Sequence, residues 1–338
     1  MSKEKIWITW EGQRRSLELA NALQAKLFVL SDADNLVRPL RYFVLSIKTL
    51  FIILKEKPKI IFAQNPSMVL PTILSFFRIW LSYRLVVDRH SNFKFHTIRS
   101  KKVIWKIFHF LSRYTIRNAD LTIVSNDYLC NIVNKWEGYG FVLQDKLPKM
   151  ALGENIKLKG KKNIVFVATF SNDEPIAEII GAAKLLNKEW IIYLTGKYDN
   201  FYNKKILTNL PENVRLTNFL SEKRYESLLL SSDLMVVLTK QEHTLNCGAY
   251  EGVAIGKPMI LSDTDAIKSY FSKGVIYSKC DSISIATAIK EGILKSDEMR
   301  KDIKLLKKEL LIKWEIRFNQ LLDIMFQVKL DRIQKKRC

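Results

Sequence analysis

Short apolar runs alternate along this chain with longer segments whose apolar residues recur at helical spacing, and this alternation limits the possible folds. In the first half, strands are predicted over residues 5–10, 25–30, 59–63, 85–88 and 120–125. The segments between them are predicted to be helices, over residues 16–23, 40–54, 69–80 and 101–116. Strands that alternate with helices indicate a parallel sheet with helical crossovers.

A polar stretch from about residue 144 to residue 162 interrupts this pattern. It contains Pro148, Gly153 and Gly160, so we interpret it as an interdomain linker. Afterwards strands are predicted over 163–169, 190–195, 214–216, 234–238 and 258–262, and helices over 176–186, 224–231, 247–255, 283–293 and 297–326. The expected fold class is therefore α/β.

We expect two doubly wound, Rossmann-like domains that face a cleft, at residues 1–150 and 160–315. A C-terminal helix at residues 316–338 is a candidate to pack back on the first domain. In such sheets ligands bind outside the carboxyl ends of the strands, so residues that follow strands are the candidates for a site.

The charge of the chain points to an anionic partner. Lys and Arg number 55 against 34 Asp and Glu, a net charge of +21, and residues 1–159 alone hold 26 basic and 12 acidic side chains. Such an excess suits a phosphorylated ligand, an anionic membrane surface or nucleic acid. No apolar run is long enough to span a bilayer, and the four cysteines are far apart, which argues against a disulfide framework.

Residues 232–263 are the most informative segment. Ser232 and Asp233 precede an apolar strand, a loop and a helix with Glu251 follow, and Gly256-Lys257-Pro258 leads into another strand. This segment resembles the nucleotide-sugar-binding part of GT-B fold glycosyltransferases. In particular it is similar to the large retaining family, glycosyltransferase family 4-like, that builds bacterial polysaccharides and glycolipids.

The resemblance implies a role for several residues of the second domain. Glu251 would bind the ribose hydroxyls of the nucleotide. Eight residues earlier, where the family has a glutamate facing the donor sugar, this chain has His243, with Glu242 as its neighbour. The backbone at Phe219 and Leu220 would hold the base. The resemblance implies retention of configuration, while His243 in place of glutamate leaves inversion open.

The start of the helix at residue 247 has its own physical argument for an anion. Thr244, Asn246 and Gly248 lie where a loop becomes a helix, and free N–H groups with the helix dipole attract a diphosphate there. The alternative is that Thr244 and Asn246 only cap the helix. The family usually has Arg and Lys in the loop after the first strand of this domain, but residues 169–175 here contain neither. Lys240 or Lys197 would then have to balance the phosphates.

Candidates for the chemistry follow strands of the first domain. Asp88 and His90 are two residues apart, so in an extended chain they point the same way, and His90 could accept a proton from an acceptor hydroxyl. Glu11 could be the general base of an inverting enzyme, and Arg14 and Arg15 could hold an acceptor phosphate. The alternatives are a loop aspartate with a surface histidine, and a solvated helix start.

Residues 89–119 contain eight basic side chains, no acidic one, and an apolar stripe at helical spacing. A basic amphipathic helix of this kind can lie on an anionic leaflet, although the stripe could equally pack against the sheet. Residues 76–84 have a similar character. We find no nucleic-acid-binding motif and no spacing typical of a metal site.

We therefore predict a cytoplasmic glycosyltransferase, peripheral on the inner face of the plasma membrane. It would move a sugar from a nucleotide diphosphate sugar to a hydroxyl of a lipid-linked or cell-surface glycan. The nucleotide sugar is a co-substrate, and no cofactor, metal or nucleic acid is expected. Two alternatives stay open: a GT-B nucleotide-sugar epimerase, and a non-catalytic basic protein that binds membranes or nucleic acid.

Overall fold

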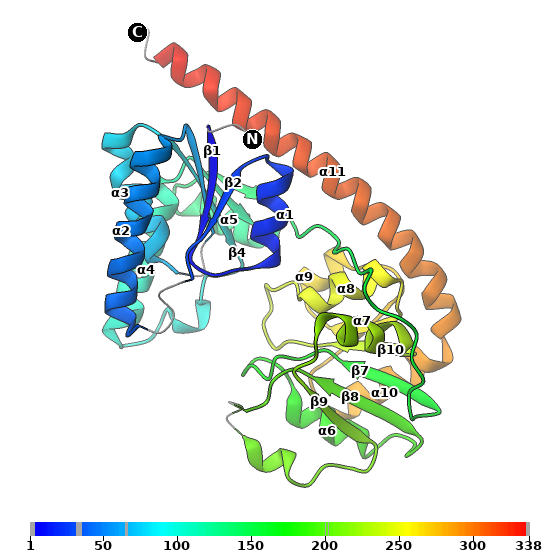
Figure 1. Ribbon diagram of the computed structural model, residues 1–338. Coiled ribbons are helices and arrows are strands. Elements are labelled where there is room, and N and C mark those ends of the chain that lie inside the picture. The colour runs from blue at the N-terminus through cyan, green and yellow to red at the C-terminus, as the bar shows by residue number, and fades with distance from the viewer. Residues whose placement is uncertain (1–3, 32–35, 65–66, 200, 202, 336–338) are drawn as a thin grey trace. The chain divides into compact units, whose positions relative to one another are not determined.

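A computed structural model describes residues 4–31, 36–64, 67–199, 201 and 203–335, with side chains up to residue 325. The chain divides into two compact units (Figure 1). The first unit comprises Met1–Lys146 and Arg317–Cys338, and the second comprises Leu147–Ile316. Each is built on a parallel six-stranded sheet flanked by helices, so the predicted α/β class with two Rossmann-like domains is confirmed.

The sheet of the first unit has the strand order β2-β1-β3-β4-β5-β6. Its strands are β1 (Lys5–Thr9), β2 (Lys26–Val29), β3 (Ile60–Gln64), β4 (Arg84–His90), β5 (Leu121–Val124) and β6 (Gly140–Val142). Its helices are α1 (Arg14–Ala22), α2 (Arg38–Glu56), α3 (Val69–Leu81), α4 (Val103–Asn118) and α5 (Asp127–Lys135). The chain reverses direction across the sheet between β1 and β3, which is where a doubly wound sheet opens a crevice at its carboxyl edge.

The sheet of the second unit has the order β12-β11-β10-β7-β8-β9, again reversing at its centre, between β7 and β10. Its strands are β7 (Lys162–Phe166), β8 (Trp190–Thr195), β9 (Val214–Asn218), β10 (Leu234–Val237), β11 (Met259–Ser262) and β12 (Val275–Ser278). Its helices are α6 (Ile176–Ala183), α7 (Glu222–Ser231), α8 (Cys247–Ile255), α9 (Asp265–Tyr270), α10 (Ser282–Leu294) and the start of α11 (Ser296–Lys335).

Burial explains why these segments became strands. Every residue of β3, β5, β10 and β11 is buried, as expected where helices cover both faces of a parallel sheet. The sequence prediction missed the short elements α5, β6, α9 and β12, which follow the expected strands closely. Each has nine residues or fewer, too short for a clear period.

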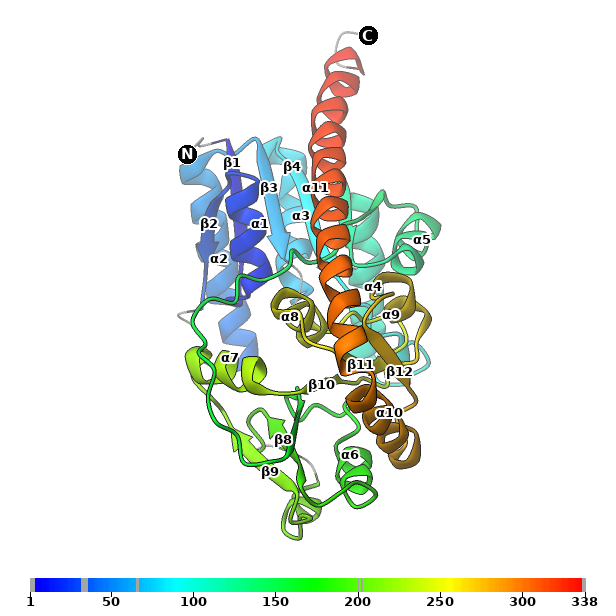
Figure 2. The same ribbon diagram turned by 90° about the vertical axis from the view of Figure 1, so that its right-hand side faces the viewer.

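The predicted linker passes beside α7 (Figure 2), and hydrogen bonds hold it to this helix of the second unit. The carboxylate of Glu226, a buried residue of α7, accepts from the backbone N–H groups of Leu152 and Gly153, at 2.6 and 2.9 Å. Further along, Ser231 of the same helix accepts from the N–H of Ile156 at 2.7 Å. These contacts make residues 152–156 a fixed part of the second unit.

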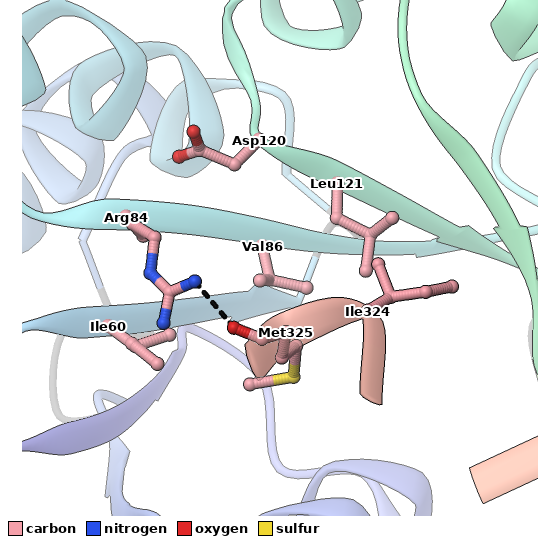
Figure 3. Close-up of a pocket in the computed structure, with 7 residues that line it drawn as sticks. All are labelled: Ile60, Arg84, Val86, Asp120, Leu121, Ile324 and Met325. Carbon is pink, nitrogen blue, oxygen red and sulfur yellow. Dashed lines mark hydrogen bonds between the residues drawn. The ribbon is translucent and has the colours of Figure 1, made fainter. Parts of the chain in front are cut away.

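The last part of α11 packs on the first unit at the amino ends of its strands. Figure 3 shows Ile324 and Met325 of α11 against apolar side chains of the sheet, with Arg84 beside them. The Arg84 guanidinium donates to the backbone oxygen of Met325 at 2.6 Å. Nearer the middle of the helix, the guanidinium of Arg317 lies 5.9 Å from the ring centre of Phe141.

Candidate active site

The second unit gathers two loops where its strand order reverses. The loop after β7 contains Asp173, and the loop after β10 contains Thr239 and Lys240. The Thr239 hydroxyl donates to the Asp173 carboxylate at 2.7 Å, and the Lys240 N–H donates to the Asp173 backbone oxygen at 2.7 Å. These bonds tie the two loops together at the edge where doubly wound sheets bind ligands.

The backbone amides of the first of these loops are already occupied by a carboxylate. Glu174 accepts hydrogen bonds from the N–H of Thr169, at 2.9 and 3.0 Å to its two oxygens, and from the N–H of Ser171 at 3.0 Å. Burial raises the pKa of Glu174 above its ordinary value, with these amides acting in the opposite direction. An anionic ligand would have to displace Glu174 to use these amides.

The two lysines predicted to balance a diphosphate are both in ion pairs. Lys240 Nζ lies 2.7 Å from Glu178 Oε1, and Lys197 Nζ lies 3.5 Å from Asp199 Oδ2. Both side chains are well exposed, so these pairs are weak and can exchange partners. Their phosphate role stays a prediction.

Helix α8 begins at Cys247, as the sequence predicted, with Asn246 as its N-cap residue. The Asn246 side chain makes no capping bond, and its buried Oδ1 accepts no hydrogen bond from the described residues. Capping is therefore the wrong interpretation for Asn246. Thr244 donates to Gln241 Oε1 at 3.2 Å, outside the helix. A Cβ on Gly248 would lie 2.9 Å from Val167 Cγ1, so glycine allows α8 to approach the loop after β7 closely.

One turn into α8, Glu251 is held by a tyrosine of α7. The Tyr225 hydroxyl donates to Glu251 Oε2 at 2.6 Å, which orients the carboxylate. Sequence reasoning missed Tyr225, because nothing in the pattern of α7 reveals which side chain reaches α8.

The two candidates for the sugar-facing position differ in their surroundings. Glu242 accepts from the N–H of Asp265, at the start of α9, at 2.9 Å. His243 is partly buried, and burial lowers its pKa, which favours the neutral imidazole. Of the base-binding candidates, Phe219 is 79% exposed, while Leu220 packs against the apolar core.

The first unit contains a buried ion cluster at the carboxyl edge of its sheet. Arg15 of α1 bonds both oxygens of Asp88, at 2.8 and 2.9 Å, and lies 2.5 Å from Asp145 Oδ1. Its third acceptor is the backbone oxygen of Leu143, at 3.0 Å. The side chains of Arg15 and Asp88 are 9% and 1% exposed. The phosphate role predicted for Arg15 therefore does not fit, because its guanidinium is already bonded to two carboxylates.

His90 has a different partner from the one predicted. A bulge interrupts the pairing of β4 between Asp88 and His90, and His90 has a φ of 52°, so the two side chains do not share a face as in a regular strand. Instead His90 Nε2 lies 3.4 Å from Asp145 Oδ2. Although burial opposes it, His90 and Arg15 hold the pKa of Asp145 well below its usual range. Asp145 replaces Asp88 as the carboxylate beside the histidine. Sequence reasoning had assigned it to the linker.

The remaining candidates lie at the start of α1. Glu11 is exposed, and its backbone N–H and oxygen both bond the Thr9 hydroxyl. Arg14 is 42% exposed and lies 3.6 Å from Glu18. No contact in the structure tests their predicted roles. Among the described residues, no helix is long and apolar enough to cross a membrane, and no cluster of His, Cys, Asp and Glu could hold a metal ion.

The family model for glycosyl transferases group 1 matches residues 152–308, which is most of the second unit. In sequence comparison no curated protein matches the chain. Among solved structures, sucrose-phosphate synthase from Thermosynechococcus elongatus superimposes with a TM-score of 0.73 at 14% identity, over 91% of this chain and 84% of that one.

Two further structures are similar over nearly the whole chain. HepE of Anabaena in complex with UDP-glucose gives a TM-score of 0.69 at 13% identity, over 94% of this chain and 91% of that one. A protein assigned as a UDP-N-acetylglucosamine 2-epimerase, from Listeria monocytogenes, gives 0.57 at 11% identity, over 94% and 98%. At these identities the likeness shows the fold alone, which is the GT-B fold with its two Rossmann-like domains.

Proposed function

We propose that this chain, whose residues 152–308 match the family model for glycosyl transferases group 1 and whose fold is that of GT-B proteins, transfers a sugar from a nucleotide diphosphate sugar to an acceptor hydroxyl. The observation that best supports the proposal is the start of α8. There Gly248 permits close packing at the point where the strand order reverses, and Glu251 lies one turn further on, held by Tyr225.

In this proposal the second unit binds the donor. Glu251 accepts from the two ribose hydroxyls, and the N–H groups at the start of α8 face the diphosphate. His243 faces the sugar, and the backbone at 219–220 faces the base. HepE has been solved with UDP and with UDP-glucose, which supports a uridine nucleotide as the first donor to test. The proposed reaction uses no metal and no cofactor besides the nucleotide sugar.

The first unit would bind the acceptor. His90, held by Asp145, hydrogen-bonds the acceptor hydroxyl or the donor sugar. We propose that configuration is retained: the bond from the sugar to the departing phosphate breaks, the bond to the acceptor oxygen forms, and the phosphate takes the proton of the acceptor hydroxyl. The proposed acceptor is a lipid-linked or cell-surface glycan, and the proposed location is peripheral, at the inner face of the membrane. The basic first half of the chain supports both.

Nucleotide-dependent thermal stabilisation tests the donor site. UDP, GDP, ADP and CDP would be compared, and one of them should raise the melting temperature, since a ligand at 100 times its Kd stabilises the native state by about 2.7 kcal/mol. Glu251→Gln should abolish that shift and the transfer of sugar. Glu291→Gln is the control, because the Glu291 side chain on α10 is 44% exposed and accepts a hydrogen bond from Lys295, four residues further on. Normal transfer by Glu251→Gln would disprove the site.

Epimerisation is the second candidate, because this chain also superimposes on 98% of the length of a protein assigned as an epimerase. The two activities separate when donor is supplied without acceptor. An epimerase would convert the donor to its epimer, whereas a transferase would leave the donor configuration unchanged. No nucleotide binding at all would favour a non-catalytic protein.

A further inference from the structure

Helix α2 presents a row of large apolar side chains to solvent. Leu40, Phe43, Ile47, Phe51 and Leu54 are between 47% and 63% exposed. They recur every three or four residues, so they form one face of the helix. The opposite face is the one that packs on the sheet, through Leu45, Thr49 and Ile53.

The same arrangement continues on the next two helices. On α3 the exposed apolar residues are Phe76, Ile79 and Trp80, and on α4 they are Val103, Ile104, Ile107 and Phe110. Helix α3 contacts both α2 and α4, and the three lie side by side on one face of the sheet (Figure 1). We call the outward side of these three helices the apolar face.

Helix α4 shows most clearly that this face is directed outward. Its buried residues are Ser112, Thr115 and Ile116, two of them small and polar, while Val103 and Phe110 are 68% and 70% exposed. The interpretation that the apolar stripe of this helix packs against the sheet is therefore wrong for Val103, Ile104 and Ile107, which are 49% to 68% exposed. Contiguous exposed apolar surface of this kind on a folded protein marks a site of interaction.

The charge around the apolar face decides which partner fits. Residues 36–118 contain 16 basic side chains and only two acidic ones, Glu56 and Asp88. Asp88 is buried and bonds Arg15, and Glu56 is paired with Lys26. A second copy of this chain would bring like charges together, which opposes association. An anionic bilayer offers apolar acyl chains for the face and phosphates for the lysines and arginines beside it.

We propose that the apolar face of α2, α3 and α4 inserts into the interface of an anionic lipid bilayer. Phe43, Phe51, Trp80 and Phe110 enter the boundary between headgroups and acyl chains. Lys101 and Lys102, exposed at the start of α4, bind lipid phosphates. This proposal deepens the peripheral location proposed above and does not depend on which sugar is transferred.

Vesicle sedimentation tests the proposal with the full chain. Vesicles of phosphatidylcholine that contain about one third phosphatidylglycerol, an anionic lipid, would be compared with vesicles of pure phosphatidylcholine. The wild type should bind the anionic vesicles at least about tenfold more tightly, and less tightly at high salt. The double variant Trp80→Glu, Phe110→Glu should bind both kinds of vesicle at least about tenfold more weakly than the wild type. Lys101→Glu with Lys102→Glu should reduce only the component that depends on anionic lipid.

Matched controls come from the second unit, where Leu294 is 85% exposed and Ile283 is 71% exposed. Leu294→Glu with Ile283→Glu should bind vesicles like the wild type. Equal loss in these controls, or wild-type binding by the Trp80 and Phe110 variant, would overturn the proposal. A second result would also overturn it: light scattering finds a wild-type dimer that the Trp80 and Phe110 substitutions dissociate, and the wild type does not bind vesicles. The nucleotide-dependent melting shift, measured on every variant, reports the donor site separately and confirms that each variant is folded.

Discussion

Replacing Arg15 by methionine should destabilise the first unit by about 3–5 kcal/mol at pH 7. The guanidinium makes two bonds to Asp88, one to the backbone oxygen of Leu143 and an ion pair with Asp145. Its removal leaves Asp88, which is 1% exposed, without its cation, and leaves Asp145 with His90 as its remaining partner. Methionine fills much of the same volume, so the loss would report the uncompensated charge rather than a cavity.

The effect of pH gives the prediction its sign. The pKa of Asp145 is held below its usual range in the folded state, so its contribution is present above the unfolded pKa, about 3.9, and is lost as pH falls toward the folded pKa. In the Arg15→Met variant the pKa of Asp145 rises, because the guanidinium no longer lowers it. Asp145 then takes up its proton at a higher pH than in the wild type, and the destabilisation should shrink as pH falls.

Urea unfolding at pH 7 and pH 4.5, with hydrogen exchange at the amides of β1 and β4 to follow the first unit alone, measures both effects. Arg14→Met is the control, because Arg14 is adjacent, 42% exposed and 3.6 Å from Glu18. The Arg14→Met substitution should lower the free energy of unfolding by less than about 1 kcal/mol. A loss below about 1 kcal/mol for Arg15→Met, or the same loss at both pH values, would refute the reasoning.

Three further predictions concern single contacts. Tyr225→Phe removes the 2.6 Å hydrogen bond to Glu251 and should raise the nucleotide Kd about three- to tenfold, with little change in the melting temperature of the free protein. A nucleotide Kd that titration calorimetry finds unchanged would exclude a positioning role for Tyr225. Gly248→Val should cost about 1–3 kcal/mol by overpacking at the start of α8, and a variant as stable as the wild type in urea would contradict the close approach. Arg84→Ala should cost about 1.5–3 kcal/mol and speed hydrogen exchange in residues 317–325, because the bond to Met325 is lost; unchanged exchange there would disprove its part in docking α11.

Local patterns were sufficient for much of the second unit. Helix α8 begins at Cys247 and ends at Ile255, the predicted bounds, with Gly256 in a left-handed conformation directly after it. A glycine at that position is the usual end of a helix, so a local signal specified the boundary. Helix α5 has such a signal too, because the Asn126 side chain accepts from the N–H of Leu129 and caps it, but α5 and β6 have only nine and three residues and show no clear period. Because both were missed, Asp145 was placed in a linker instead of beside a site.

The α/β class, the two sheets and the segment around Glu251 could be predicted from local patterns, because hydrophobic spacing and helix-ending residues act over a few neighbours in the chain. The partners of Asp88 and His90 depend on the folded chain, since a bulge in β4 changes the direction of a side chain without leaving a clear mark in the sequence. The tertiary structure also decided the outcome for α4. Periodicity shows that a helix has an apolar face, but what lies across from that face depends on the rest of the fold. There Ser112, Thr115 and Ile116 are buried, whereas Val103, Ile104, Ile107 and Phe110 remain exposed to solvent.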